Sequence, residues 1–143
     1  MAKVLPRVIL LRGRGERREA PAAAAITPGM LIAYNTSGSF VPHPTAAGAA
    51  RKIFAVENDH NGKGIDDAYA TNDYVQGEEL TSGCDVNALV AAGHAAIARG
   101  AKLESAGNGT LRAVTAGFPI AEALEAVDNS GGGAAARIKV TIL

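Results

Sequence analysis

Residues 137–142 read RIKVTI, and this stretch decides the fold class. Its apolar side chains, Ile138, Val140 and Ile142, recur at every second position, with polar side chains between them. Because successive side chains of a β-strand point to opposite faces of a sheet, this alternation predicts a half-buried terminal strand. We therefore expect a sheet with one face on a hydrophobic core.

The chain upstream of this strand has the same character from residue 30 onward. Short apolar or alternating runs, separated by turn residues, occupy residues 30–34, 40–41, 53–57, 74–80 and 86–90. Two further runs, 102–104 and 111–115, flank Asn108-Gly109, a dipeptide that strongly favours a tight hairpin turn. This spacing of short strands is typical of an all-β domain, and it predicts a hairpin near the C-terminus.

Two segments depart from the strand pattern. Ile120, Ala123, Leu124 and Val127 follow the i, i+3, i+4, i+7 spacing of a helix. Residues 87–99 contain Ala-rich stretches that could also form a short helix. The residues alone therefore predict a mainly β chain with a short helix.

The length of 143 residues fits one domain with its own core. Pro28 biases Thr27 toward extended geometry, and Pro28-Gly29 favours a type II turn. We place the start of the globular part there. The predicted organisation is an extended N-terminal arm and hinge, residues 1–25, followed by a β-rich domain, residues 26–143.

Charge is unevenly distributed although the formal net charge is zero. Residues 1–19 hold six Lys or Arg against Glu16 and Glu19, whereas most acidic residues fall in 57–85, where Lys63 is the only basic one. A basic arm and an acidic body predict head-to-tail contacts between copies.

The residue types that carry catalysis or bind metals are sparse. His43, His60 and His94 are far apart and fit no zinc pattern, and the single Cys84 leaves no intrachain disulfide. Residues 59–70 begin like a calcium loop, but Lys63 and Ala70 stand where ligands belong. We expect no cofactor, no metal and no enzymatic activity. The enzyme alternative requires a deep pocket around Cys84 or His94.

The Arg/Gly run formed by residues 12–18 is the one segment suited to nucleic acid, since clustered Arg side chains neutralise phosphates. Against this stand Glu16 and Glu19, the neutral total and the absence of a nearby aromatic residue. We expect no nucleic-acid partner. No apolar window approaches the length of a membrane span, and the apolar-then-basic order of residues 8–18 is not that of a secretory signal.

A series of short motifs resembles the capsid cement, or head decoration, proteins of tailed phages in both order and spacing. They are Ile26-Thr27-Pro28-Gly29, Tyr69-Ala70, Asp73-Tyr74-Val75, Asp85-Val86-Asn87-Ala88-Leu89, Ala98-Arg99-Gly100, Leu103-Glu104-Ser105, Gly109-Thr110-Leu111, Ala123-Leu124-Glu125-Ala126 and Arg137-Ile138-Lys139-Val140. The resemblance covers about residues 20–143 and leaves the segment before Ala20 without a counterpart.

The resemblance implies a compact β-sandwich or tulip-like barrel, a projecting N-terminal arm and no active site. It also implies homo-oligomers, with a trimer favoured, and makes residues 120–127 a strand against their helical spacing. The implied function is to bind the outside of an expanded icosahedral phage head and to stabilise it by bridging subunits of the major capsid protein. The protein would be made in the host cytoplasm and reside on the outer surface of the virion.

The arm supplies the candidate capsid contacts. An extended arm can add a strand to an exposed sheet edge, while Arg side chains pair with carboxylates. The predicted augmenting strand is Val8, Ile9, Leu10 and Leu11, and the predicted ionic anchors are Arg12, Arg14, Arg17 and Arg18. The alternative for this segment is a frayed terminus without a partner.

A second function class remains open. A β-rich virion surface adhesion module that binds a host glycan or protein would have the same composition. Exposed aromatic residues on the loops 42–48 and 58–69 would favour it, and Tyr69 is the only aromatic residue there.

Overall fold

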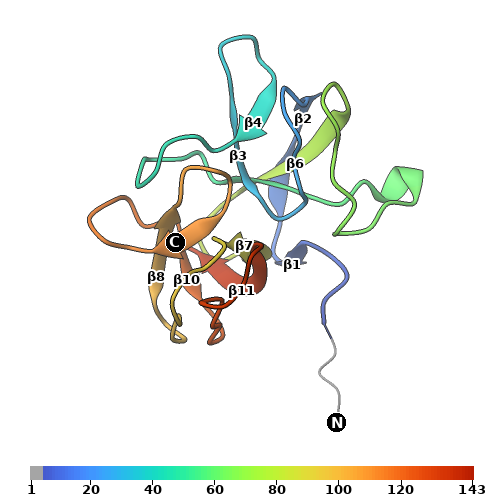
Figure 1. The fold of residues 1–143 in the computed structure, drawn as a ribbon. Coiled ribbons are helices and arrows are strands. Elements are labelled where there is room, and N and C mark those ends of the chain that lie inside the picture. Colours follow the sequence, from blue (N-terminus) through green and yellow to red (C-terminus); the bar gives the residue numbers. More distant parts are fainter. Residues whose placement is uncertain (1–4) are drawn as a thin grey trace.

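The computed structural model describes residues 5–143 and confirms a mainly β fold (Figure 1). The sequence-predicted strand runs all appear as strands, with small shifts at their ends. In chain order the elements are β1 Leu10–Arg12, β2 Gly15–Pro21, β3 Leu31–Tyr34, β4 Phe40–Pro42, β5 Ile53–Ala55, the 3-10 helix η1 Asp59–Asn61, β6 Tyr74–Leu80, β7 Asp85–Val90, β8 Lys102–Ser105, β9 Leu111–Ala113, β10 Ala121–Ala123 and β11 Ala136–Ile142.

One sheet closes into a small barrel. Its strands follow the order β1-β7-β11-β10-β8-β9, and a parallel contact between Val90 and Leu111 joins β9 back to β7. The strand β1 lies outside this ring, on β7. The terminal strand β11 pairs with β7 on one side and β10 on the other, and Ile138, Val140 and Ile142 are all buried. The alternation in residues 137–142 therefore predicted this strand and its buried face correctly.

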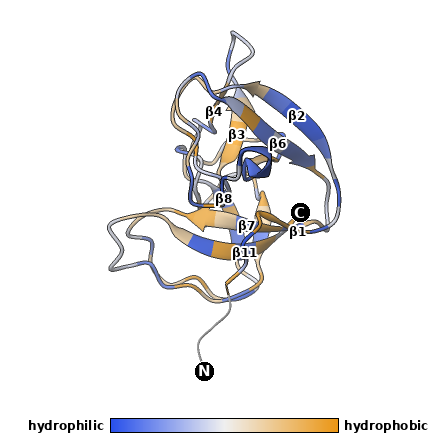
Figure 2. Cartoon of the chain, turned by 90° about the vertical axis from the view of Figure 1, so that its right-hand side faces the viewer, coloured by the Kyte–Doolittle hydropathy of each residue, from blue (hydrophilic) through white to orange (hydrophobic). Residues whose placement is uncertain are grey.

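The second sheet has the order β2-β6-β5-β3-β4. Its longest pairing joins β2 to β6 over seven residue pairs, from Gly15 opposite Leu80 to Pro21 opposite Tyr74. A bridge between Ala22 and Phe40 connects the far end of the β2 segment to β4. Figures 1 and 2 show this sheet packed against the barrel, with β7 and β11 on the barrel side and β2, β3, β4 and β6 on the other.

The two sheets share a hydrophobic core. The larger cluster is centred in the barrel, but it also includes Leu31, Phe54 and Leu80 from the second sheet. A smaller cluster lies within the second sheet around Phe40 and Ile53. Because the larger cluster draws side chains from both sheets, separating them would expose apolar surface on each.

The predicted hairpin is present. Strands β8 and β9 pair antiparallel, with Ser105 opposite Leu111, and the Ala106 amide donates to the Thr110 carbonyl across the turn at 2.9 Å. Asn108 and Gly109 lie in this turn, and Gly109 has a φ of 84°.

The helical spacing of residues 120–127 gave a wrong prediction, and the strand implied by the resemblance is correct for its first half. Residues Ala121–Ala123 form β10, between β8 and β11. The Ala123 amide donates to the Ala101 carbonyl and the Leu124 amide to the Lys139 carbonyl. Hydrogen bonds to strands on both sides outweigh the local helical preference, because tertiary context overrides propensity.

The predicted short helix is also absent from 87–99, where β7 is followed by a turn and a bridge between Ile97 and Val127. Among residues 5–143 the one helical element is η1, three residues long, in the polar loop after β5.

The boundary between an arm, residues 1–25, and a body from residue 26 is not present. Ile9 is fully buried in the barrel core, β1 pairs with β7, and β2 forms an edge of the second sheet. Gly13, with a φ of 95°, makes the turn between them, where a Cβ would lie 2.6 Å from the Cys84 Sγ. Residues 9–22 therefore belong to the body, because their apolar side chains and peptide groups find partners there; residues 1–4 lie outside the described part.

We predict that Ile9→Ala destabilises the protein by about 2–5 kcal/mol, because it removes a fully buried side chain and leaves a cavity. The adjacent control, Val8→Ala, should change the free energy of unfolding by no more than about 0.5 kcal/mol, since Val8 is 48% exposed. Urea unfolding of the three proteins measures both values. Equal effects would show that Ile9 does not anchor the N-terminal segment in the core.

Candidate interaction surface

The chain before β1 carries apolar side chains in contact with solvent. Leu5 is 65% exposed and Val8 48% exposed, with Arg7 exposed between them. In Figure 1 this segment leads away from the body beside β1. Within the described part of the predicted arm, the residues that project are therefore 5–8, which include Val8.

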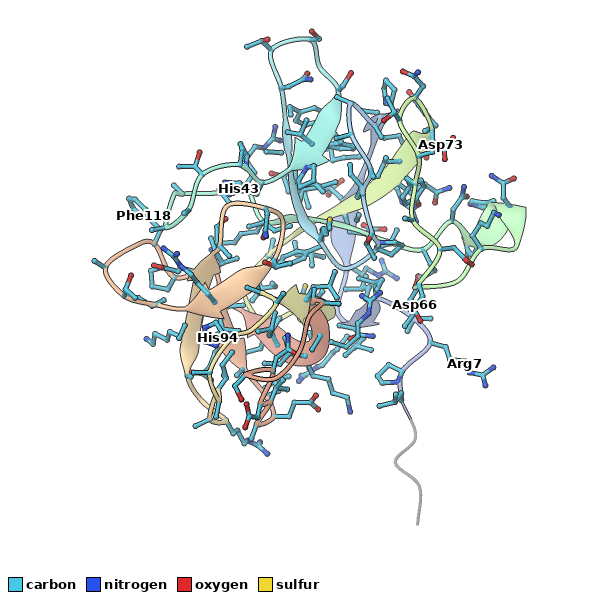
Figure 3. All side chains as sticks on the ribbon, in the orientation of Figure 1. Arg7, His43, Asp66, Asp73, His94 and Phe118 are labelled. Carbon is cyan, nitrogen blue, oxygen red and sulfur yellow. The ribbon has the colours of Figure 1, made fainter. Side chains whose placement is uncertain are left out.

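A groove of about 790 Å³ runs beside this segment. Its lining mixes apolar side chains with both signs of charge. The lining residues are Leu5, Pro6, Arg7, Gly64, Ile65, Asp66, Asp67, Asn87, Glu125, Val127, Arg137 and Lys139. Figure 3 shows Arg7 and Asp66 on the same side of the molecule.

Arg137 fixes one wall of the groove. Its guanidinium donates to the carbonyls of Pro28 and Ile65, each at 2.6 Å, and pairs with the Asp66 carboxylate at 3.2 Å. These contacts connect β11 to the polar loop after β5. The part of this loop that carries Ile65 and Asp66 is thus held at a defined position.

The predicted augmenting strand is already paired within the chain. Ile9 is buried, and Leu10 and Leu11 belong to β1, with Leu10 opposite Val86 of β7. Yet β1 is the edge of its sheet, so its other side is not covered by a strand in residues 5–143. The predicted augmenting strand is therefore itself an open sheet edge, which lies next to the projecting residues 5–8.

The four predicted ionic anchors divide into two pairs. Arg17 pairs with Glu78 at 3.1 Å and Arg18 with Glu79 at 3.0 Å, across the β2–β6 ladder. The prediction of head-to-tail contacts between basic arm and acidic body is corrected for these two residues, because antiparallel pairing brings the charges together inside one chain.

The other two anchors remain available. Arg12 and Arg14 are exposed and form no ion pair with another residue of 5–143. Arg12 stands at the end of β1, directly at the open sheet edge. These two side chains can pair with acidic groups of a partner without breaking an existing contact.

Cys84 and His94, on which the enzyme alternative depends, both make hydrogen bonds with backbone groups. Cys84 is buried, with its Sγ 3.4 Å from the Arg14 carbonyl oxygen. The His94 Nδ1 lies 2.6 Å from the Ala95 carbonyl oxygen and must donate to it, so Nε2 accepts from the Ala113 amide at 3.0 Å. Neither Cys84 nor His94 lines the groove.

The side chain of His43 also makes hydrogen bonds within the protein. Its Nε2 lies 3.1 Å from the Ala49 carbonyl oxygen, which can only accept, so Nε2 donates there, and its Nδ1 lies 2.8 Å from the Ser105 Oγ. Both side chains are buried, and the pair connects the loop after β4 to β8.

In the described part of the chain, no group of three or more His, Cys, Asp and Glu side chains is arranged to hold a metal ion. Nor does any helix of residues 5–143 have the length and apolar character to cross a membrane.

A buried carboxylate organises the other end of the molecule. Glu104 of β8 is fully buried and accepts hydrogen bonds from the Arg112 Nε at 2.9 Å, the Gly117 amide at 2.9 Å and the Thr115 hydroxyl at 3.2 Å. Burial raises the pKa of Glu104, but these hydrogen bonds and the Arg112 charge outweigh it, so the pKa lies below its ordinary value.

The hydrogen bonds to Glu104 fix the loop that follows β9. Gly117 lies so close to its neighbours that a Cβ would be 2.3 Å from the Ala47 Cβ and 2.4 Å from the Glu104 Oε2. The next residue, Phe118, donates its amide to the Ala47 carbonyl at 3.1 Å, while its side chain is 61% exposed. A backbone held by these hydrogen bonds therefore presents an aromatic ring to solvent (Figure 3).

Sequence reasoning missed this arrangement. The signal available was a charged residue at the centre of Leu103-Glu104-Ser105, inside a strand whose flanking residues are apolar or small. In the structure these three residues are all buried. The sequence does not show which groups donate hydrogen bonds to Glu104. In the structure these donors come from β9 and from the loop after it.

No protein-family model matches the chain, and no curated protein matches it either.

We predict that Glu104→Gln destabilises the protein at pH 7, because a neutral amide cannot replace the carboxylate as acceptor for Arg112 and two further donors. Since the folded pKa of Glu104 lies below its ordinary value of 4.5, the ionised form adds stability above about pH 4.5. The difference between wild type and variant should therefore shrink as pH falls through the folded pKa.

Urea unfolding between pH 7 and pH 3 measures this. Glu19→Gln, at an exposed position on β2, serves as the control and should follow the wild-type profile. A gap between wild type and Glu104→Gln that is independent of pH would contradict the assignment of an ionised, stabilising Glu104.

Proposed function

We propose that the protein is a capsid decoration protein that binds the outside of an expanded icosahedral phage head and stabilises it by bridging subunits of the major capsid protein. The observation that carries the proposal is the open edge of β1 beside exposed Leu5 and Val8. Arg12 and Arg14 lie next to this edge, and neither forms an ion pair with another residue of 5–143. The resemblance in residues 20–143 supports the same function.

The open edge of β1 provides the first part of the contact. Edge strands expose main-chain donors and acceptors, and an extended segment of another protein can pair with them as an added strand. On this protein the receiving strand is Leu10–Arg12, held in place because its other side pairs with β7. The partner segment would extend the barrel sheet by one strand.

Side chains around the edge provide the second part. Leu5 and Val8 can be covered by apolar surface of the capsid subunit, which gains about 25 cal/mol for each Å² removed from water. Arg12 and Arg14 can pair with carboxylates, and such hydrogen bonds are stronger than neutral ones. The contact therefore combines main-chain pairing, apolar burial and charge.

A decoration protein does not require a strong single contact. Identical sites repeat over an icosahedral shell, and subunits that are joined to one another bind with an avidity above that of one interface. A decoration subunit that spans the junction between two capsid subunits adds its binding free energy to the stability of that junction. A compact β body with one interactive edge is sufficient for this task.

The adhesion alternative receives no support from the loops that would favour it. Tyr69, the aromatic residue of the loops 42–48 and 58–69, is buried, and its hydroxyl donates to the Val56 carbonyl at 2.7 Å. A glycan or protein receptor would therefore find no exposed aromatic ring on these two loops.

The test is co-sedimentation with undecorated, expanded heads of the virus that carries this chain. We expect saturable binding of the wild type at a fixed ratio to capsid subunits. Deletion of residues 1–8 should leave the unfolding midpoint close to that of the wild type, because Ile9 is the first buried residue of the described part, yet it should lower occupancy at least about tenfold.

Arg12→Glu tests the charged part of the contact, and Arg99→Glu is the matched control, since Arg99 is an exposed arginine on the loop before β8. Only Arg12→Glu should weaken binding, and added salt should weaken wild-type binding. If the wild type binds no expanded head at any ratio, the decoration function is wrong, and binding to host-cell glycans becomes the next measurement.

A further inference from the structure

The sequence contains two Asn-Gly pairs, Asn61-Gly62 and Asn108-Gly109. In this dipeptide the main-chain nitrogen after the asparagine can attack the side-chain amide with little hindrance, because glycine has no Cβ and rotates freely. The attack requires this nitrogen to approach the side-chain carbonyl carbon, Cγ. Whether an Asn-Gly pair reacts in a folded protein therefore depends on how firmly its surroundings hold the main chain and the side chain.

Asn61-Gly62 lies on an exposed turn with few restraints. Asn61 is the last residue of η1, which contains no buried residue, and Gly62 follows with a left-handed φ of 71°. A Cβ on Gly62 would meet no atom within 4 Å, and within residues 5–143 the Asn61 side chain has no hydrogen-bond partner. In Figure 1, η1 is the coil at the outer margin of the molecule.

Three main-chain hydrogen bonds near the surface hold this turn. The Gly62 amide donates to the Asp59 carbonyl at 3.0 Å, and the amides of Asn61 and Lys63 donate to the Asn58 carbonyl at 3.2 and 3.1 Å. Segments with solvent-exposed hydrogen bonds and few buried contacts open locally at a small cost in free energy. Opening of this single turn frees the Gly62 nitrogen while both sheets stay intact.

Asn108-Gly109 is held on both sides of the bond that would form. The Asn108 Oδ1 accepts hydrogen bonds from the amide and the hydroxyl of Thr110, and the Gly109 amide donates to the His43 carbonyl at 3.3 Å. Gly109 is buried, and a Cβ on it would lie only 3.0 Å from the Pro42 Cβ. The hairpin end must therefore separate from the loop after β4 before the Gly109 nitrogen can reach the side chain.

We propose that Asn61 is a site of spontaneous deamidation in the folded protein, whereas Asn108 is protected. The Gly62 nitrogen attacks the Asn61 Cγ, and a C–N bond forms. The amide proton of Gly62 passes through water to the side-chain amide nitrogen, the bond from Cγ to that nitrogen breaks, and ammonia leaves. Water then opens the resulting cyclic imide at either carbonyl, which gives aspartate or isoaspartate. The reaction needs only water and no oxidant or reductant.

The modification changes both the charge and the main chain of the loop after β5. The new carboxylate joins Asp59, Asp66 and Asp67 in a loop whose only Lys or Arg is Lys63. Isoaspartate also lengthens the main chain by a methylene group between β5 and Asp66, where Arg137 holds the loop. The chain therefore passes with time from a formal net charge of zero to a more acidic form, with the new charge in the loop that forms one wall of the groove.

The test is incubation of the purified full chain in mildly alkaline buffer, folded and in urea, followed by tryptic digestion and mass spectrometry. Asn61 and Asn108 fall in different tryptic peptides, residues 53–63 and 103–112, and fragment ions separate Asn61 from Asn58. In the folded protein we expect Asn61 to convert at least about tenfold faster than Asn108, because its turn opens more easily. In urea the two should convert at similar rates, because both then precede a glycine in an unfolded chain.

Isoelectric focusing gives a second measurement, since the wild type should accumulate a more acidic form during the incubation. Asn61→Gln should not accumulate it, because the longer side chain would have to close a larger and less favourable ring. Asn108→Gln is the matched control at the other pair and should accumulate the acidic form at the wild-type rate. Circular dichroism and the urea midpoint confirm that each variant is folded.

Two results would overturn the proposal. One is an acidic form that accumulates in Asn61→Gln as fast as in the wild type. The other is a folded chain in which Asn61 is slowed, relative to the chain in urea, as strongly as Asn108 is. The inference goes beyond capsid binding and does not depend on it, since both measurements are made on the protein alone.

Discussion

The structure depends on the pairing of β7, which is the one strand in residues 5–143 that pairs with three others. It pairs with β11 along its whole length, with β1 near its start and with β9 at Val90. The last contact closes the barrel, and closure gives partners to peptide groups that would otherwise form open edges. Because the barrel is closed, its core can rely on small aliphatic side chains in a chain without Trp.

The same strand explains why the N-terminal segment changes character at Ile9. In residues 5–8 the side chains are exposed or half-buried; from Ile9 onward, the backbone pairs with β7 and then, after the turn at Gly13, with β6. The six basic residues among residues 1–19 favour an arm, but of the described residues 5–19 only 5–8 project from the body. The remainder stabilises both sheets, so the proposed capsid contact is built on a fixed strand rather than on a long tail.

Buried polar groups serve the opposite end of the molecule. Glu104 is desolvated, which is costly, but three hydrogen bonds compensate for it. All buried side-chain nitrogen and oxygen atoms of the described residues have hydrogen-bond partners. The consequence is a set of loops with fixed geometry, separated from the N-terminal edge by the barrel.

The sequence by itself determined most strands, the hairpin at Asn108-Gly109 and the buried face of residues 137–142, because alternation and turn chemistry act over a few residues. Tertiary structure alone decided three matters: that residues 121–123 form a strand, that residues 9–21 pair within the body, and that Glu104 gathers donors from 112, 115 and 117. Each depends on partners distant in sequence or on the course of a loop. A local sequence pattern does not show which distant backbone or side-chain groups will pack against a segment. The hydrogen bonds that residues 121–123 make with such groups outweigh their local helical preference.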